Sequence, residues 1–193
     1  MGCTLTNLLF HAEILFSENG YHATSISQIA KSIGVTKQAV LYHFPKKILI
    51  YTAIIEGSAN CLHDIVKGYK DLPPDEALIA FFKFTHNPDD KYRRIISLTM
   101  RDLLDNQNKN IEEKKKWFYK EFLDELEGVI LKGQKMGMFQ NVHARSFMYQ
   151  LIGAVHYFII AEPTLKQIYS AKSFEDHRKN SILQIETMIK SLK

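Results

Sequence analysis

The side chains best suited to chemistry in this 193-residue sequence lie between Thr36 and His43. If that segment is a helix, Val40 faces a core and four polar side chains remain on the outer face: Thr36, Lys37, Gln38 and Tyr42. These side chains supply the hydrogen-bond donors and acceptors that suit base edges and phosphates. We therefore predict a nucleic-acid contact here. On this pattern alone, an ordinary corner between two helices stays open as the alternative.

Charge around this segment is distributed unevenly. The stretch from Asn19 to Ile55 contains no Asp or Glu, although 21 acidic residues in 193 would place about four there on average. The same stretch contains four lysines: Lys31, Lys37, Lys46 and Lys47. A surface that meets a polyanion repels acidic side chains and recruits lysines. Chance fluctuation in a short window is the alternative, and the net charge of +4 is too small to identify a partner by itself.

Apolar spacing and turn residues predict the helices that would position these side chains. A first helix runs from residue 5 to a stop at Asn19-Gly20. Two short helices follow, the first capped by Ser25 or Ser27 and the second by Thr36, with Gly34 in the turn between them. Two short helices joined in this way predict a helix-turn-helix.

The rest of the chain has the same helical periodicity. Further helices are predicted over 48–69, from 74, from 90, over 111–135, over 144–161 with Pro163 as the stop, and from 174 to the end. No stretch alternates with period two between hairpin turns, so the predicted fold class is all-α. No apolar stretch has the roughly 20 residues that a membrane span needs. Two scattered cysteines, Cys3 and Cys61, indicate a reducing cytoplasm.

The residues around the predicted helix-turn-helix follow one continuous pattern. It reads Phe16-x-x-x-Gly20-Tyr21-x-x-Thr24-x-x-x-x-Ile29-Ala30-x-x-x-Gly34-Val35-Thr36-Lys37 and then Tyr42-His43-Phe44-Pro45-x-Lys47. This pattern resembles the amino-terminal domain of TetR/AcrR-family transcriptional regulators, over about residues 5–55 without gaps. The remaining two thirds of the chain resembles that family only in layout.

The resemblance implies an organisation and a function. An amino-terminal three-helix helix-turn-helix domain, residues 1–48, would be joined by a connecting helix to a larger helical domain for ligand binding and dimerisation, residues 49–193. The protein would be a homodimer that binds double-stranded DNA at a palindromic operator, most simply as a repressor that a small hydrophobic or aromatic effector releases. Two apolar faces on the last two predicted helices also favour a dimer.

The resemblance also assigns roles to single residues. Four positions match those that face bases: Ser27, Lys37, Gln38 and Ala39. Five match positions that touch the phosphate backbone: Ser25, Thr36, Tyr42, His43 and Lys47. His43 has an alternative role in bracing the end of its helix. Leu41 stands where the family usually has a tyrosine that contacts the backbone, and no Lys/Arg-rich arm precedes the first helix.

A candidate effector pocket follows from the large apolar side chains of the later helices. Its predicted lining is Phe84, Ile96, Met100, Trp117, Phe118, Phe122, Tyr149, Ile152 and His156. Such a lining has few polar groups and suits a hydrophobic or flat aromatic compound. The alternative for each of these residues is a place in the ordinary core.

Other chemistry finds little support in the residues. Cys61 and His63 are two apart and diverge on a helix, so we predict no metal site. No phosphate loop, nucleophile elbow or paired carboxylate motif is present, so no cofactor and no enzymatic activity are predicted. Two alternatives stay open: a helical protein-interaction module that has lost DNA binding, and a small enzyme in which the helix-turn-helix is a coincidence.

Overall fold

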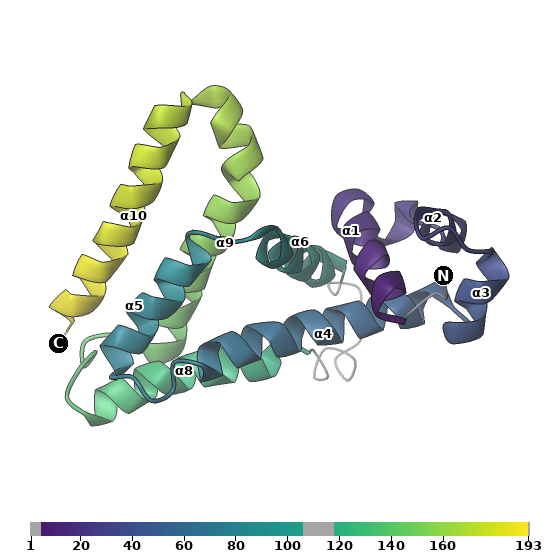
Figure 1. Ribbon diagram of the computed structural model, residues 1–193. Coiled ribbons are helices and arrows are strands. Elements are labelled where there is room, and N and C mark those ends of the chain that lie inside the picture. Colours follow the sequence, from purple (N-terminus) through teal and green to yellow (C-terminus); the bar gives the residue numbers. More distant parts are fainter. Residues whose placement is uncertain (1–4, 106–117, 193) are drawn as a thin grey trace. The chain divides into compact units, whose positions relative to one another are not determined.

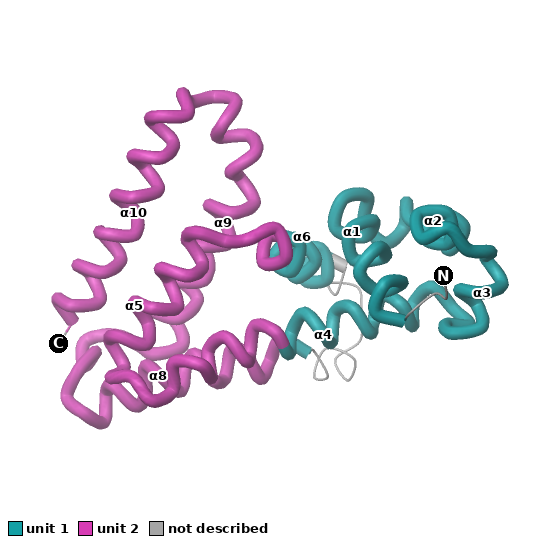
Figure 2. Tube along the Cα trace, in the orientation of Figure 1, with its two compact units in different colours: residues 1–60, 94–118 teal, residues 61–93, 119–193 magenta. Residues whose placement is uncertain are grey.

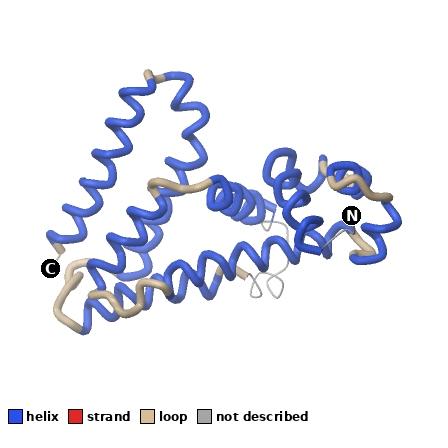
Figure 3. The backbone as a smooth tube through the Cα atoms, viewed as in Figure 1, coloured by secondary structure: helices blue, strands red, loops and turns tan. Residues whose placement is uncertain are grey.

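The computed structural model describes residues 5–105 and 118–192, and every regular element in those ranges is a helix (Figures 1 and 3). The helices are α1 (Leu5–Ala23), α2 (Ile26–Ser32), α3 (Lys37–His43), α4 (Lys47–Lys67), α5 (Pro74–Thr85), α6 (Asp90–Asp105), α8 (Lys120–Lys135), α9 (Ala144–Ile168) and α10 (Ala171–Ser191). The predicted all-α class is confirmed. None of the described helices combines the length and apolarity that crossing a lipid bilayer demands.

The chain forms two compact units, which Figure 2 shows in different colours. The first unit comprises residues 1–60 and 94–118, and the second comprises residues 61–93 and 119–193. Two helices, α4 and α6, therefore have part of their length in each unit. The division predicted between residues 48 and 49 stays a prediction, since these units describe packing and not function.

Local signals explain the short helices of the first unit. Ser25 caps α2: its side chain accepts a hydrogen bond from the backbone of Gln28, and the Gln28 side chain accepts one from the backbone of Ser25. Thr36 caps α3 by accepting from the backbone of Ala39. Gly34 takes a φ of 70°, the left-handed value that the turn between the helices requires. These predicted cap and turn positions are confirmed, with Ser25 rather than Ser27 as the first cap.

The second unit is a set of longer helices around its own core. α5 packs against α8 and α10, while α9 packs against α8 and α10. Buried apolar side chains come from each of them: Leu78, Phe82, Phe122, Leu126, Ile130, Phe147, Leu151, Phe158, Ile185 and Ile189. The described part of the helix predicted over 111–135 is α8, and the earlier part of that prediction lies outside the described residues.

The predicted stop at Pro163 is wrong, because α9 continues through this residue to Ile168. Proline removes one amide donor and one intrahelical hydrogen bond, which costs stability but does not forbid a helix. Two ion pairs of Glu162 lie next to Pro163, and one of them spans it. The Glu162 carboxylate binds Arg93 of α6 and, one turn on, the Lys166 ammonium at 2.7 Å. The last helix also begins three residues earlier than predicted, with Ser170 as its cap.

Candidate nucleic-acid interface

The two short helices form the expected helix-turn-helix. α2 packs on α3, and the turn is held by hydrogen bonds from the Val35 amide to the Ala30 carbonyl at 3.0 Å and from Gly34 to Lys31 at 3.2 Å. Ile29, Ala30 and Val40 are buried. A small residue at the crossing and a left-handed glycine in the turn fix the angle between the helices, so the outward face of α3 has a defined orientation.

The residues predicted to face bases lie at the starts of the two short helices. Ser27, Lys37 and Gln38 are exposed, and Ala39 is half-buried. Lys37 and Gln38 occupy the first turn of α3, immediately after the Thr36 cap. A cap of this kind keeps the helix start ordered, so both long side chains project from a fixed backbone. Their contact with bases stays a prediction.

The residues predicted to touch phosphates differ in how many partners they already have. Ser25 and Thr36 are exposed, although their hydroxyl groups accept backbone hydrogen bonds as helix caps. Tyr42 is 85% exposed, and the His43 ring packs edge-on against it with centroids 5.3 Å apart. Tyr42 and His43 therefore form one exposed aromatic surface at the end of α3.

Lys47 has partners that the sequence did not indicate. It is half-buried, and its Nζ donates hydrogen bonds to the backbone carbonyls of Tyr21 at 2.7 Å and Thr24 at 2.9 Å. The same ammonium lies 4.1 Å from the centroid of the Tyr21 ring. The predicted phosphate contact of Lys47 is not tested by these bonds, but its ammonium already has an internal role.

A row of contacts between α6 and α1 was also missed. Arg94 Nε donates to Glu13 Oε1 at 2.7 Å, the Ser97 hydroxyl donates to the Ser17 carbonyl at 3.3 Å, and Arg101 donates to the Glu18 carbonyl at 3.3 Å. These residues belong to the first unit. Residues of α6 therefore bond to α1, the helix on which α2 packs, although α1 and α6 lie far apart in the sequence. Periodicity identifies α6 as a helix but not its partner.

The residues of the predicted effector pocket fall in both units. In the second unit, Phe122, Ile152 and His156 are buried, while Phe84 and Tyr149 are exposed. The Phe122 ring packs against Phe81 and the Phe84 ring against Tyr92, so both rings contact residues outside the predicted set. In the first unit, Ile96 is buried, Met100 is half-buried and Phe118 is exposed. Trp117 lies outside the described residues. The pocket as a whole stays a prediction.

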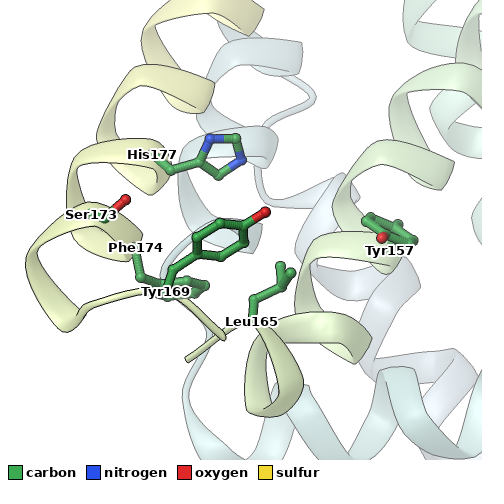
Figure 4. Close-up of a pocket in the computed structure, with 6 residues that line it drawn as sticks. All are labelled: Tyr157, Leu165, Tyr169, Ser173, Phe174 and His177. Atoms are coloured by element: carbon green, nitrogen blue, oxygen red, sulfur yellow. The ribbon is translucent and has the colours of Figure 1, made fainter. Parts of the chain in front are cut away.

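One cavity of the second unit has a different lining. It has a volume of about 380 Å³ and lies between the end of α9 and the start of α10 (Figure 4). Its walls are Tyr157, Leu165, Tyr169, Ser173, Phe174 and His177. In Figure 4 the Tyr169 ring extends between His177 and Leu165, with Tyr157 on the far side. Its volume is at the small end of ligand sites. The sequence did not indicate it, because ending the helix at Pro163 separated Leu165 and Tyr169 from α9.

Two histidines of the second unit are buried. His86 Nδ1 lies 2.8 Å from the Phe82 carbonyl and Nε2 lies 3.3 Å from the Ser181 hydroxyl, and burial lowers its pKa. Burial lowers the pKa of His156 from 6.5 to about 4. Both imidazoles are therefore neutral near pH 7, and His156 contributes an apolar surface to the core of α9 at that pH.

An all-helical chain in which α1 supports a capped helix-turn-helix has the architecture of a helix-turn-helix DNA-binding protein. Residues 8–54 match the family of bacterial regulatory proteins called the tetR family. The family and the relatives described next are transcriptional regulators, not enzymes.

Relatives with known functions match just under half of the chain. The negative transcriptional regulator IcaR of the biofilm operon icaADBC is 31% identical over 90 residues in Staphylococcus epidermidis, covering 46% of this chain and 49% of the relative. IcaR of Staphylococcus aureus strain Newman is 32% identical over 91 residues, with the same coverage of 46% and 49%. The chain thus spans about half the length of the curated relatives it matches.

Solved structures match more of the chain. PfmR, a TetR-family regulator from Thermus thermophilus, has a TM-score of 0.66 and 22% identity, with 82% of this chain and 86% of that chain covered. A transcriptional regulator from Saccharomonospora viridis in complex with choline has a TM-score of 0.71 and 21% identity, covering 92% and 94%. KstR2 of Mycobacterium tuberculosis, a ketosteroid transcriptional regulator, has a TM-score of 0.72 and 14% identity, covering 97% of both chains. These similarities show a shared fold.

Proposed function

We propose that this protein is a ligand-responsive transcriptional repressor that binds a palindromic operator as a homodimer. The observation that carries the proposal is the exposed pair Lys37 and Gln38 on the first turn of the capped helix α3, within a stretch that has no acidic residue. Repression is supported by the similarity to IcaR, which is a negative regulator. Such a protein would act in the cytoplasm, where the bacterial chromosome lies.

Substitutions in α3 test the proposed reading of DNA. Lys37→Ala and Gln38→Ala should each cost about 1–3 kcal/mol in affinity for the operator, because bidentate contacts to bases are of this size. Binding to a random duplex should change less. The measurement is a titration of each variant with an operator selected from a random library and with a scrambled duplex. Lys67→Ala, at an exposed position at the end of α4, is the matched control. Equal losses on both duplexes would contradict the assignment to bases.

Dimerisation is supported by exposed apolar side chains on α9. Tyr149, Tyr157, Ile160 and Ile168 are between 48% and 70% exposed. They recur at helical spacing along one side of α9, and an apolar stripe of this length is stabilised when a symmetric copy covers it. We expect light scattering at micromolar concentration to give about twice the monomer mass of 22.4 kDa. Tyr157→Glu should shift the protein toward the monomer, and a wild-type monomer would contradict the proposal.

The effector that we propose is a small hydrophobic or aromatic molecule. Support comes from the apolar side chains of the second unit and from structural neighbours that hold ligands, one with choline and one, AibR, with isovaleryl coenzyme A and operator DNA. If effector and operator favour different conformations, each must weaken the binding of the other by the same factor. A tenfold effect requires a difference of only about 1.4 kcal/mol, which a few apolar contacts can supply.

A further inference from the structure

We propose that Lys47 is a positioning residue that fixes the corner between α1 and α2. Its effect on DNA binding then comes from this corner and not from a bond with phosphate. Through that corner it would set the orientation of the helix-turn-helix on DNA. The inference rests on the proposed DNA-binding function. It assigns to Lys47 a role different from the phosphate contact that the family resemblance implies.

The first step is the bonding of the ammonium group. An ammonium has three donors, and two of those of Lys47 are used by the Tyr21 and Thr24 carbonyls at 2.7 and 2.9 Å. We would expect a lysine that mainly binds phosphate to keep its ammonium group exposed to solvent in the DNA-free protein. Lys46, the preceding residue, is exposed in this way.

The second step is the kind of carbonyls that are bound. α1 is broken at Gly20, where φ is 81° and ψ is 167°, so the carbonyls beyond it lack the partners of a continuing helix. The Thr24 hydroxyl donates to the Gly20 carbonyl at 2.9 Å. Lys47 supplies donors for two further carbonyls of the corner. Cationic side chains stabilise such helix ends by bonding the last carbonyls.

The third step is the aromatic packing beneath the ammonium. The Tyr21 ring lies 4.1 Å from Nζ, 5.0 Å from the Tyr51 ring and 5.9 Å from the Phe16 ring, measured to ring centroids. Tyr51 is one helical turn after Lys47 on α4. The first two turns of α4 therefore hold Tyr21 in two ways, by a cation–π contact and by ring packing.

The last step is what the corner controls. Thr24 is followed directly by Ser25, the cap of α2, and α2 packs on α3. A shift of the Thr24 carbonyl therefore moves the start of α2, which includes Ser27, and with it the helix that carries Lys37 and Gln38. Because α4 begins at Lys47 and continues into the second unit, this lysine ties the start of α4 to the helix-turn-helix.

A chemical experiment tests the bonding without DNA. The wild-type protein is treated with an acetylating reagent at limiting concentration, and mass spectrometry measures the rate at each lysine. Lys47 should react at least fivefold more slowly than Lys46 in the DNA-free protein, because its ammonium is half-buried and bonded. Equal rates for the two lysines without DNA, with protection of Lys47 only after DNA is added, would overturn the proposal.

Salt dependence then separates positioning from phosphate contact. Lys47→Met should weaken operator binding tenfold or more at every salt concentration and leave the slope of log K against log salt unchanged, and Lys47→Arg should restore much of the affinity. If Lys47 instead contacted a phosphate directly, its loss from both DNA-binding domains of the dimer (the two heads) would make the slope shallower by about 1.8. That outcome, or no change in affinity, overturns the proposal. Lys46→Met is the matched control, because it removes the same charge from an exposed neighbouring lysine. We expect Lys47→Met to lower the thermal unfolding temperature and Lys46→Met to leave it unchanged.

The outcomes distinguish this proposal from the proposed function. If the wild-type protein binds no palindromic duplex, the repressor function fails, but slow acetylation of Lys47 would still support its role in the corner. If Lys47→Met does not fold, the acetylation of the wild-type protein remains decisive. If the wild-type protein binds DNA and Lys47 reacts as fast as Lys46, the positioning role alone fails.

Discussion

Raising the salt concentration from about 50 to about 200 mM is expected to weaken operator binding by about three to four orders of magnitude. We expect each of two heads to engage about three to four phosphates, which gives a slope of log K against log salt of roughly −5 to −7. The stretch around α3 has exposed lysines, among them Lys31, Lys37 and Lys46, and no acidic residue to oppose them. Fluorescence anisotropy with a labelled operator at four salt concentrations measures the slope.

The control for this experiment is a charge removed far from α3 in the sequence. Lys67→Met removes an exposed charge from the part of α4 that lies in the second unit, and it should leave the slope unchanged. Lys31→Met should make the slope shallower if its ammonium meets a phosphate in each head. A slope near zero for the wild-type protein would exclude DNA binding through this surface.

Acidification is expected to destabilise the fold through His156. Its pKa is about 4 in the folded protein against an ordinary value of 6.5, because burial disfavours the charged imidazole. Between these values the unfolded chain binds a proton that the folded chain does not. The contribution of neutral His156 to the free energy of unfolding is therefore fully present above about pH 6.5, and it is lost progressively as the pH falls toward 4. At about 1.36 kcal/mol per pH unit, the loss attributable to His156 is about 2–3 kcal/mol at pH 4.5.

Urea unfolding of matched variants isolates this contribution. His156→Leu removes the titrating group, and its free energy of unfolding should depend less on pH between 7.5 and 4.5 than that of the wild-type protein, by about 2–3 kcal/mol. His22→Gln, at an exposed position of α1, is the control and should leave the dependence unchanged. His86 has a lowered pKa for the same reason and accounts for some of the loss that remains in His156→Leu. Identical pH dependence of wild type and His156→Leu would show that this imidazole does not titrate as its burial requires.

Sequence reasoning succeeded where a single residue determines the local backbone. Thr36 caps a helix because its hydroxyl reaches a backbone amide three residues on, and Gly34 makes the turn because it accepts a positive φ. Both effects act within a few residues. The helix-turn-helix and its exposed face could therefore be predicted from a pattern of about 30 residues.

Sequence reasoning failed where the local structure depends on contacts with residues far away in the sequence. The sequence predicts a stop at Pro163, yet α9 continues through this residue to Ile168, with ion pairs from the adjacent Glu162 to Arg93 and Lys166. The sequence also showed no sign of the bonds from Lys47 to the Tyr21 and Thr24 carbonyls, while its predicted phosphate contact stays a prediction. A carbonyl carries no sequence signal, because every residue has one. Bonds of this kind are found only after the backbone is placed.

The packing of α6 on α1 has a consequence for the modular exchange of DNA-binding heads. A graft that carries only α1 to the start of α4 would leave behind Arg94, Ser97 and Arg101, which bond to Glu13 and to two carbonyls of α1. In the transplanted domain the half-buried Glu13 carboxylate would then lack the Arg94 guanidinium that binds it. A chimera that preserves this head must therefore take two separate stretches of the chain, α1 through the first half of α4 together with α6 from Arg94 onward.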